Sequence, residues 1–179
     1  MIQKEMMKRP AISVLFFFLL VLSSCVGDEK AEGAFADCKY AQPEPIFNKS
    51  SDQIEDHRFS LDGQRGVEIV HFSEGVQLKL TQEGCDDLRQ IFEFTFPSLD
   101  IRDDSPDFWL MLAVAQFDQI ADIGADYMVF GSWAAALVRN RDQFEFGESV
   151  RIQKGFYVKV DRMKGKKGGI LMLTLSQTP

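Results

Sequence analysis

The stretch at residues 66–96, GVEIVHFSEGVQLKLTQEGCDDLRQIFEFTF, contains three runs in which apolar and polar side chains alternate. A Ser-Glu-Gly segment at 73–75 separates the first two runs, and an acidic turn at 83–87 separates the second from the third. Alternation with a period of two is typical of strands, and short turns of this composition join antiparallel neighbours. The stretch therefore predicts an antiparallel meander with one buried face.

The buried face of this meander follows from the phase of the apolar residues. In the second and third runs they are Val76, Leu78 and Leu80, then Phe92, Phe94 and Phe96. In the first run we assign the inner face to the phase that holds Val67, Ile69 and His71. The other phase of that run, which includes Glu68, is then expected to face outward.

A long helix is predicted after the meander, over about 105–123. Ser105 is a favourable N-cap, Pro106 suits the first helical position, and Asp107 complements the positive end of the helix dipole. Gly124 is a suitable residue to end the helix. Apolar residues cover most of its circumference near the start, which predicts deep burial.

The rest of the chain predicts a short second helix and more strands, among them a short strand at 58–61, before the meander. A short strand is possible at 127–130, and the second helix is expected at 133–138. Strand patterns follow at 144–146, 150–153, 156–161 and 170–176, with a basic loop, RMKGKKGG, at 162–169. Strands, then helices, then strands without regular alternation predict an α+β fold with an antiparallel sheet of hairpins.

Residues 1–25, MIQKEMMKRPAISVLFFFLLVLSSC, have the three parts of a secretory signal. A positively charged start precedes a predominantly apolar run at 11–22, and small residues follow it. This run is shorter than the roughly 20 residues that a membrane-spanning helix needs. We therefore expect the segment to direct export and to be removed.

This segment resembles the signal peptide of a bacterial lipoprotein precursor, with Leu22-Ser23-Ser24-Cys25 as its lipobox. The resemblance implies that Cys25 is acylated with fatty acids such as palmitate and becomes the first residue. More than one acyl chain gives stable membrane attachment. Since Val26 and not Asp follows the cysteine, the resemblance also implies the outer membrane, facing the periplasm or the cell surface. The chain then divides into a signal peptide at 1–24, a lipidated cysteine and tether at 25–37, and one globular domain at 38–179.

Charge excludes one class of partner. Removing residues 1–24, which hold three basic residues and one acidic residue, leaves 17 basic and 26 acidic residues of the 20 and 27 in the full chain. The remaining net charge of −9 disfavours nucleic acid, because neutralisation of phosphates dominates such binding. It also offers no general attraction to anionic lipid, so the acyl chains must supply the membrane attachment.

The two other cysteines, Cys38 and Cys85, predict a disulfide bond, because exported proteins fold in an oxidising compartment. The bond would tie an extended, proline-containing arm at 38–48 to the end of the meander. Reactive or metal-binding thiols are the alternative, although no Cys-x-x-Cys pair is present.

Few residues suggest chemistry, and no cofactor motif is present. His57 lies in a polar segment and is expected to be solvated, whereas His71 is the candidate for a catalytic base. The acidic loop before the long helix is a weak candidate for a cation site, with Asp100, Asp103, Asp104 and Asp107 as its oxygen donors. The ordinary interpretation of these acids is a solvated loop and a helix start.

Three functional hypotheses follow. The first is a lipid-anchored envelope module that binds a protein partner or another molecule and has no catalytic activity. The second is a hydrolase whose site combines His71, the acidic loop and a hydroxyl group. The third is an inhibitor of a secreted enzyme. The absence of a recognisable catalytic motif favours the first.

Overall fold

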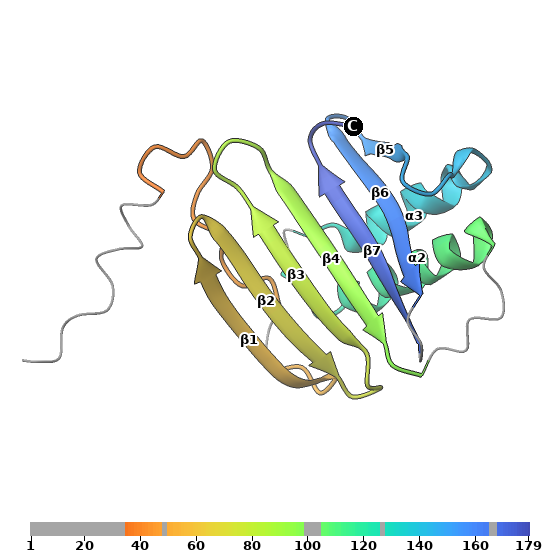
Figure 1. The fold of residues 1–179 in the computed structure, drawn as a ribbon, viewed down its shortest axis with the longest axis horizontal. Coiled ribbons are helices and arrows are strands. Elements are labelled where there is room, and N and C mark those ends of the chain that lie inside the picture. The colour runs from red at the N-terminus through yellow and green to blue at the C-terminus, as the bar shows by residue number, and fades with distance from the viewer. Residues whose placement is uncertain (1–34, 48–49, 99–104, 126–127, 165–167) are drawn as a thin grey trace, which may run out of the picture. The chain divides into compact units, whose positions relative to one another are not determined.

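Among the residues that the structure describes, seven strands form one antiparallel sheet in the order β1-β2-β3-β4-β7-β6-β5, and the two helices lie against one of its faces (Figure 1). This arrangement comes from a computed structural model that describes residues 35–47, 50–98, 105–125, 128–164 and 168–179. The described elements belong to one compact unit, Ala34–Pro179. The predicted α+β class with an antiparallel sheet is confirmed.

The predicted meander is β2 (Arg65–Phe72), β3 (Gln77–Glu83) and β4 (Arg89–Phe96). Its two turns lie where the sequence places them, and every residue of β3 has an antiparallel partner on β4. A longer strand than expected, β1 (Ile54–Asp62), precedes it and pairs with β2 through a two-residue turn at Gly63 and Gln64. Gly63 has a φ of 59°, a value that a left-handed turn residue requires.

The buried phase of β2 is opposite to the predicted one. Glu68, Val70 and Phe72 face the helices, whereas Val67, Ile69 and His71 lie on the open face. Val70 pairs with Leu78 and Glu68 pairs with Leu80, so their side chains share the face that the apolar residues of β3 define. The prediction was wrong because a carboxylate occupies a core position, which made the two phases of β2 nearly equal in apolar content.

The long helix, α2 (Pro106–Ala121), is confirmed, with Ser105 as its N-cap. The Ser105 hydroxyl accepts a hydrogen bond from the Phe108 backbone N–H at 3.2 Å. The second helix, α3 (Phe130–Arg139), is longer than predicted and begins at a residue for which a strand was considered. A single 3₁₀ turn, Arg141–Gln143, follows it, and no strand forms at 144–146.

The C-terminal strands complete the sheet on the side of β4. They are β5 (Ser149–Gln153), β6 (Phe156–Lys164) and β7 (Gly169–Ser176). The last of them, β7, pairs with both β4 and β6, so it lies inside the sheet and leaves β1 and β5 as the edges. Its inner positions are buried leucines, as predicted: Leu171, Leu173 and Leu175.

The core between the sheet and the helices is strongly aromatic. The ring of Phe130, from α3, contacts four others at centroid separations of 5.3–6.3 Å, namely Phe47, Phe92, Phe117 and Trp133. These rings come from the N-terminal arm, the sheet and both helices, so Phe130 joins all the layers of the fold. Aromatic pairs of this kind contribute beyond their buried area.

None of the helices in the described residues is long and apolar enough to cross a bilayer.

Candidate functional site

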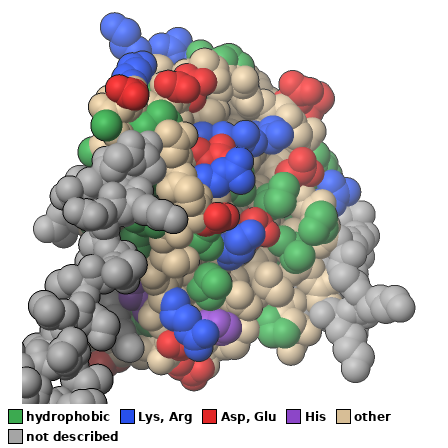
Figure 2. Space-filling view, turned by 60° about the vertical axis from the view of Figure 1, so that its left-hand side comes forward, with side chains coloured by type: hydrophobic (Ala, Val, Ile, Leu, Met, Phe, Trp, Pro, Cys, Tyr) green, Lys and Arg blue, Asp and Glu red, His purple; other side chains and the backbone are tan. Residues whose placement is uncertain are grey.

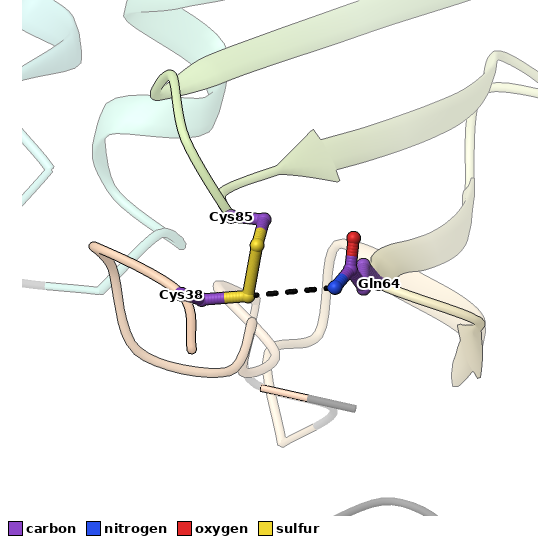
Figure 3. The surroundings of a disulfide bond; sticks show 3 residues. All are labelled: Cys38, Gln64 and Cys85. Atoms are coloured by element: carbon purple, nitrogen blue, oxygen red, sulfur yellow. Dashed lines mark hydrogen bonds between the residues drawn. A yellow bond between two sulfur atoms is a disulfide. The ribbon is translucent and has the colours of Figure 1, made fainter. Parts of the chain in front are cut away.

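The N-terminal arm, residues 38–47, is fixed at both of its ends to the rest of the domain. At the first end, Cys38 forms the predicted disulfide bond with Cys85, in the turn between β3 and β4 (Figure 3). The Lys39 backbone N–H donates to the Cys85 carbonyl at 2.8 Å. Gln64, from the turn between β1 and β2, donates its side-chain amide to the sulfur of Cys38 at 3.6 Å (Figure 3). The disulfide thus places the start of the arm at the end of the sheet that holds both of these turns.

At the other end of the arm, the Glu68 carboxylate accepts three hydrogen bonds. The backbone N–H of Ile46 donates to Oε2 at 2.9 Å, and that of Phe47 donates to Oε1 at 2.9 Å. The His57 Nε2 atom lies 2.6 Å from Oε1. The Glu68 side chain is fully buried, and that of His57 is 11% exposed. A buried carboxylate is tolerated when it is paired and hydrogen-bonded in this way.

The middle of the arm is also bound through its backbone. The Gln82 side chain donates to the Glu44 carbonyl at 2.8 Å, and the Ala125 N–H donates to the Ile46 carbonyl at 2.8 Å. Pro43 packs on Gly66, where a Cβ added to the glycine would lie 2.6 Å from the proline Cβ. Glu68 and Gln82 both face the helix side of the sheet, where their side chains form hydrogen bonds with backbone groups of the arm. In a sheet a neighbouring strand would satisfy such backbone groups, and here the two side chains do so instead.

This cluster was missed by sequence reasoning. The prediction that His57 is solvated is wrong, because β1 begins earlier than expected and turns His57 toward Glu68. An acidic residue within an alternating strand was the available signal, since a buried acid needs nearby donors. The arm that supplies two of these donors is 21 or more residues away in sequence, so spacing could not identify them.

An imidazole next to a carboxylate is also the pair that orients a catalytic base in hydrolases. Here both oxygens of Glu68 accept hydrogen bonds from backbone N–H groups of the arm, and one of them also contacts the His57 ring. We therefore interpret the cluster as a latch for the arm, and we refer to Glu68, His57 and the backbone N–H groups of Ile46 and Phe47 as the Glu68 latch.

Of the residues predicted for other chemistry, the structure describes His71 and Asp107, and these two lie on different elements. His71 lies on the open face of the sheet, where its neighbours in the ladder are Asp56 and Gln77. Asp107 forms an ion pair with Arg141, which links the start of α2 to the segment after α3. The other acids of the predicted cation loop, Asp100, Asp103 and Asp104, and the predicted lipidation site, Cys25, lie outside the described residues. Within the described part of the chain, no three His, Cys, Asp or Glu side chains are grouped as metal ligands.

The helices and the arm cover one face of the sheet and leave the other face open. Ion pairs join neighbouring strands on this face, with Lys79 to Glu93 at 3.2 Å and Arg65 to Glu83 at 3.2 Å. Between these two ion pairs runs a row without charge that crosses β1, β2, β3, β4 and β7 and ends at Lys159 of β6. It consists of Ser60, Val67, Thr81, Ile91 and Thr174. Figure 2 shows this mixture, with acidic and basic side chains among apolar ones on the part of the surface in view. Such a surface is neither strongly charged nor strongly apolar.

A small hollow, open to solvent, lies near the C-terminal end of β7. Its walls are formed by Leu88, Gln90, Trp133, Phe156, Leu175 and Ser176. The buried Nε1 of Trp133 and Oε1 of Gln116 have no hydrogen-bond partner among the described residues. Buried groups of this kind are commonly satisfied by ordered water.

The latch and the open face are features of this chain's own geometry. Comparisons with protein-family models, with curated proteins and with solved structures found no match to the chain.

Proposed function

We propose that the chain is a lipid-anchored bacterial envelope protein whose folded domain acts by binding a partner rather than by catalysis. The observation that carries this proposal is the disulfide between Cys38 and Cys85. Disulfides persist in oxidising compartments, which is where a lipoprotein-like signal would deliver the chain. The bond and the lipobox are independent features of the sequence, and both agree with export.

The attachment of the arm supports the anchoring part of the proposal. A lipidated Cys25 would be joined to the domain through residues 26–37, and that connection reaches the fold at Cys38. Any pull on the lipid would pass first to the disulfide and then to the Glu68 latch. These two attachments tie the start of the domain to the rest of the fold at the point where such a pull would act.

The open face of the sheet is the proposed binding surface. Antiparallel sheets commonly leave one face to solvent, so exposure alone does not indicate a partner. The face is, however, wide, and its paired charges leave β-branched side chains such as Val67 and Ile91 accessible between them. A protein surface in the envelope or outside the cell fits this mixture of neutral, apolar and paired charged groups.

Protease treatment of cells that express a C-terminally tagged chain tests the proposal. The wild-type chain should remain in the membrane fraction, and Cys25→Ser should release it or leave the precursor unprocessed. Digestion on intact cells would place the domain on the surface, and protection until lysis would place it in the periplasm. If the Cys25→Ser chain were as membrane-bound and as processed as the wild type, the anchoring proposal would fail.

The binding surface needs a separate experiment. Cross-linking in intact cells, followed by mass spectrometry, should recover a partner with the wild type, and Ile91→Lys should abolish its recovery. Val138, which is 46% exposed on α3, supplies the matched control as Val138→Lys. Equal loss of the partner with both variants would exclude the open face as the binding surface.

A further inference from the structure

The edge strand β1 has one side free of any strand in the described part of the sheet. Its ladder with β2 is regular from Asp56 to Asp62, so the free side presents a long row of backbone donors and acceptors. Such an edge is a template for pairing with another strand, and proteins usually blunt it with charge, bulges or a cover. Here the charges on β1 are of both signs.

The tight turn between β1 and β2 shows which residues of β1 direct their backbone N–H and C=O groups toward β2 and which direct them toward the free edge. Asp62 and Arg65 close a two-residue hairpin loop, so they exchange both of their hydrogen bonds. Alternation then directs the backbone groups of Leu61 and Phe59 away from β2, toward the free side. An added antiparallel strand would form its hydrogen bonds with these two residues.

The side chains of β1 differ between the two faces of the sheet. On the open face they are polar and exposed, with Arg58, Ser60 and Asp62 in succession. On the helix side, Phe59 and Leu61 are apolar and half-buried. A complementary strand would therefore carry opposite charges on one face and apolar side chains on the other.

We propose that this partner is β1 of a second copy of the chain, paired antiparallel about a twofold axis at Ser60. In this register Arg58 lies opposite the partner's Asp62, and Asp62 lies opposite the partner's Arg58. Phe59 lies opposite the partner's Leu61, with which it forms a hydrogen-bonded pair. The twofold axis repeats both contacts, so the interface contains two Arg58–Asp62 pairs and two Phe59–Leu61 contacts. A symmetric interface of this kind is the usual form of a homodimer.

Neighbouring twofold registers lack this match. An axis at Phe59 places Asp56 opposite the partner's Asp62, which brings two acids together. An axis at His57 brings Asp56 to the partner's Arg58 but places Phe59 opposite the partner's Glu55. Like charges directly opposite on a sheet destabilise the pair, and opposite charges stabilise it. The register at Ser60 satisfies both faces and places no like charges opposite each other.

The proposed dimer extends the sheet across the two copies and leaves the open face of each exposed. It therefore goes beyond the proposed binding function, and it does not depend on the lipid anchor. Ser60 would lie opposite the partner's Ser60 in a non-hydrogen-bonded pair, where Cα atoms are about 4.5 Å apart. That separation permits a disulfide between two copies if both residues are cysteine.

The test is disulfide trapping in the purified full-length chain. Under mild oxidation, Ser60→Cys should form a covalent dimer rapidly. Ser132→Cys, at an exposed position on α3, is the matched control and should not. Rapid trapping at both positions, or at neither, would overturn the proposal.

Charge exchange then tests the register. In the Ser60→Cys background, Arg58→Asp alone or Asp62→Arg alone should slow trapping at least tenfold, because each change creates two repulsive pairs. The combined variant, Arg58→Asp with Asp62→Arg, should restore the original rate. Since the contact of Arg58 with Asp56 at 2.9 Å is lost in the first and in the combined variant alike, restoration reports on the contact between copies. A failure of the combined variant to recover, with its fold intact by circular dichroism, would refute the proposed register.

Discussion

Replacement of Glu68 by Gln tests the Glu68 latch with almost no change in volume. The amide can accept a hydrogen bond only through its oxygen, so one of the two backbone N–H groups at Ile46 and Phe47 loses its acceptor. The charge that pairs with His57 at 2.6 Å is also removed. The change therefore affects all three of the hydrogen bonds described for the carboxylate.

The expected loss of unfolding free energy follows from these contacts. Hydrogen bonds to charged groups contribute about 1.5–3 kcal/mol, and an orphaned buried donor costs about 1–3 kcal/mol. Because the His57 ring can turn toward water when the carboxylate is lost, the contributions will not add fully. We expect Glu68→Gln to lower the stability by about 3–4 kcal/mol, which is a large fraction of the roughly 5–15 kcal/mol of a typical domain.

Equilibrium unfolding in urea, with the disulfide intact, measures this loss. The matched control is Glu93→Gln on the open face, whose partner Lys79 is 45% exposed, and it should cost less than about 1 kcal/mol. A double-mutant cycle with His57→Ala should give a coupling energy of at least about 1 kcal/mol between His57 and Glu68. Equal costs for Glu68→Gln and Glu93→Gln would refute the reasoning, as would a coupling energy near zero.

Three further changes probe the rest of the framework by the same unfolding assay. Replacing both Cys38 and Cys85 by Ala should cost about 2–5 kcal/mol, and an unchanged midpoint would mean that the bond does not constrain the unfolded chain. Phe130→Ala should cost about 3–5 kcal/mol because four aromatic neighbours lose a partner, against about 0.5 kcal/mol or less for the exposed Val138→Ala. Gly66→Ala should cost about 1–3 kcal/mol by forcing Pro43 away from β2, and a neutral result would show that the arm shifts without loss.

Much of the fold could be predicted from local patterns. The meander, the capped helix and the leucines of β7 follow from alternation, capping residues and turns, each of which operates within a few residues. The disulfide was predictable because only two cysteines remain once Cys25 is assigned to the lipid. These features can be predicted without knowing which residues pack against them.

The Glu68 latch could not be predicted, because it depends on contacts between distant segments. Alternation alone predicts that Glu68 lies on the surface, whereas the arm supplies its donors in the core. The polar segment around His57 predicts a solvated ring, whereas His57 lies within β1 and contacts Glu68. The position of β7 between β4 and β6 likewise depends on pairing between strands that are far apart in the sequence. Hydrophobic periodicity and composition are properties of one segment at a time. Predictions based on them therefore fail for polar residues, such as Glu68 and His57, whose partners lie in other segments.

The central claim, that a lipid-modified Cys25 joins this domain to a bacterial membrane, is tested most directly by mass spectrometry of the mature N-terminus. We predict that the first residue is Cys25, with a mass increased by a diacylglyceryl group and an amide-linked acyl chain, and that residues 1–24 are absent. An unmodified Cys25, or a chain that retains residues 1–24 in cells that process other lipoproteins, would contradict the account.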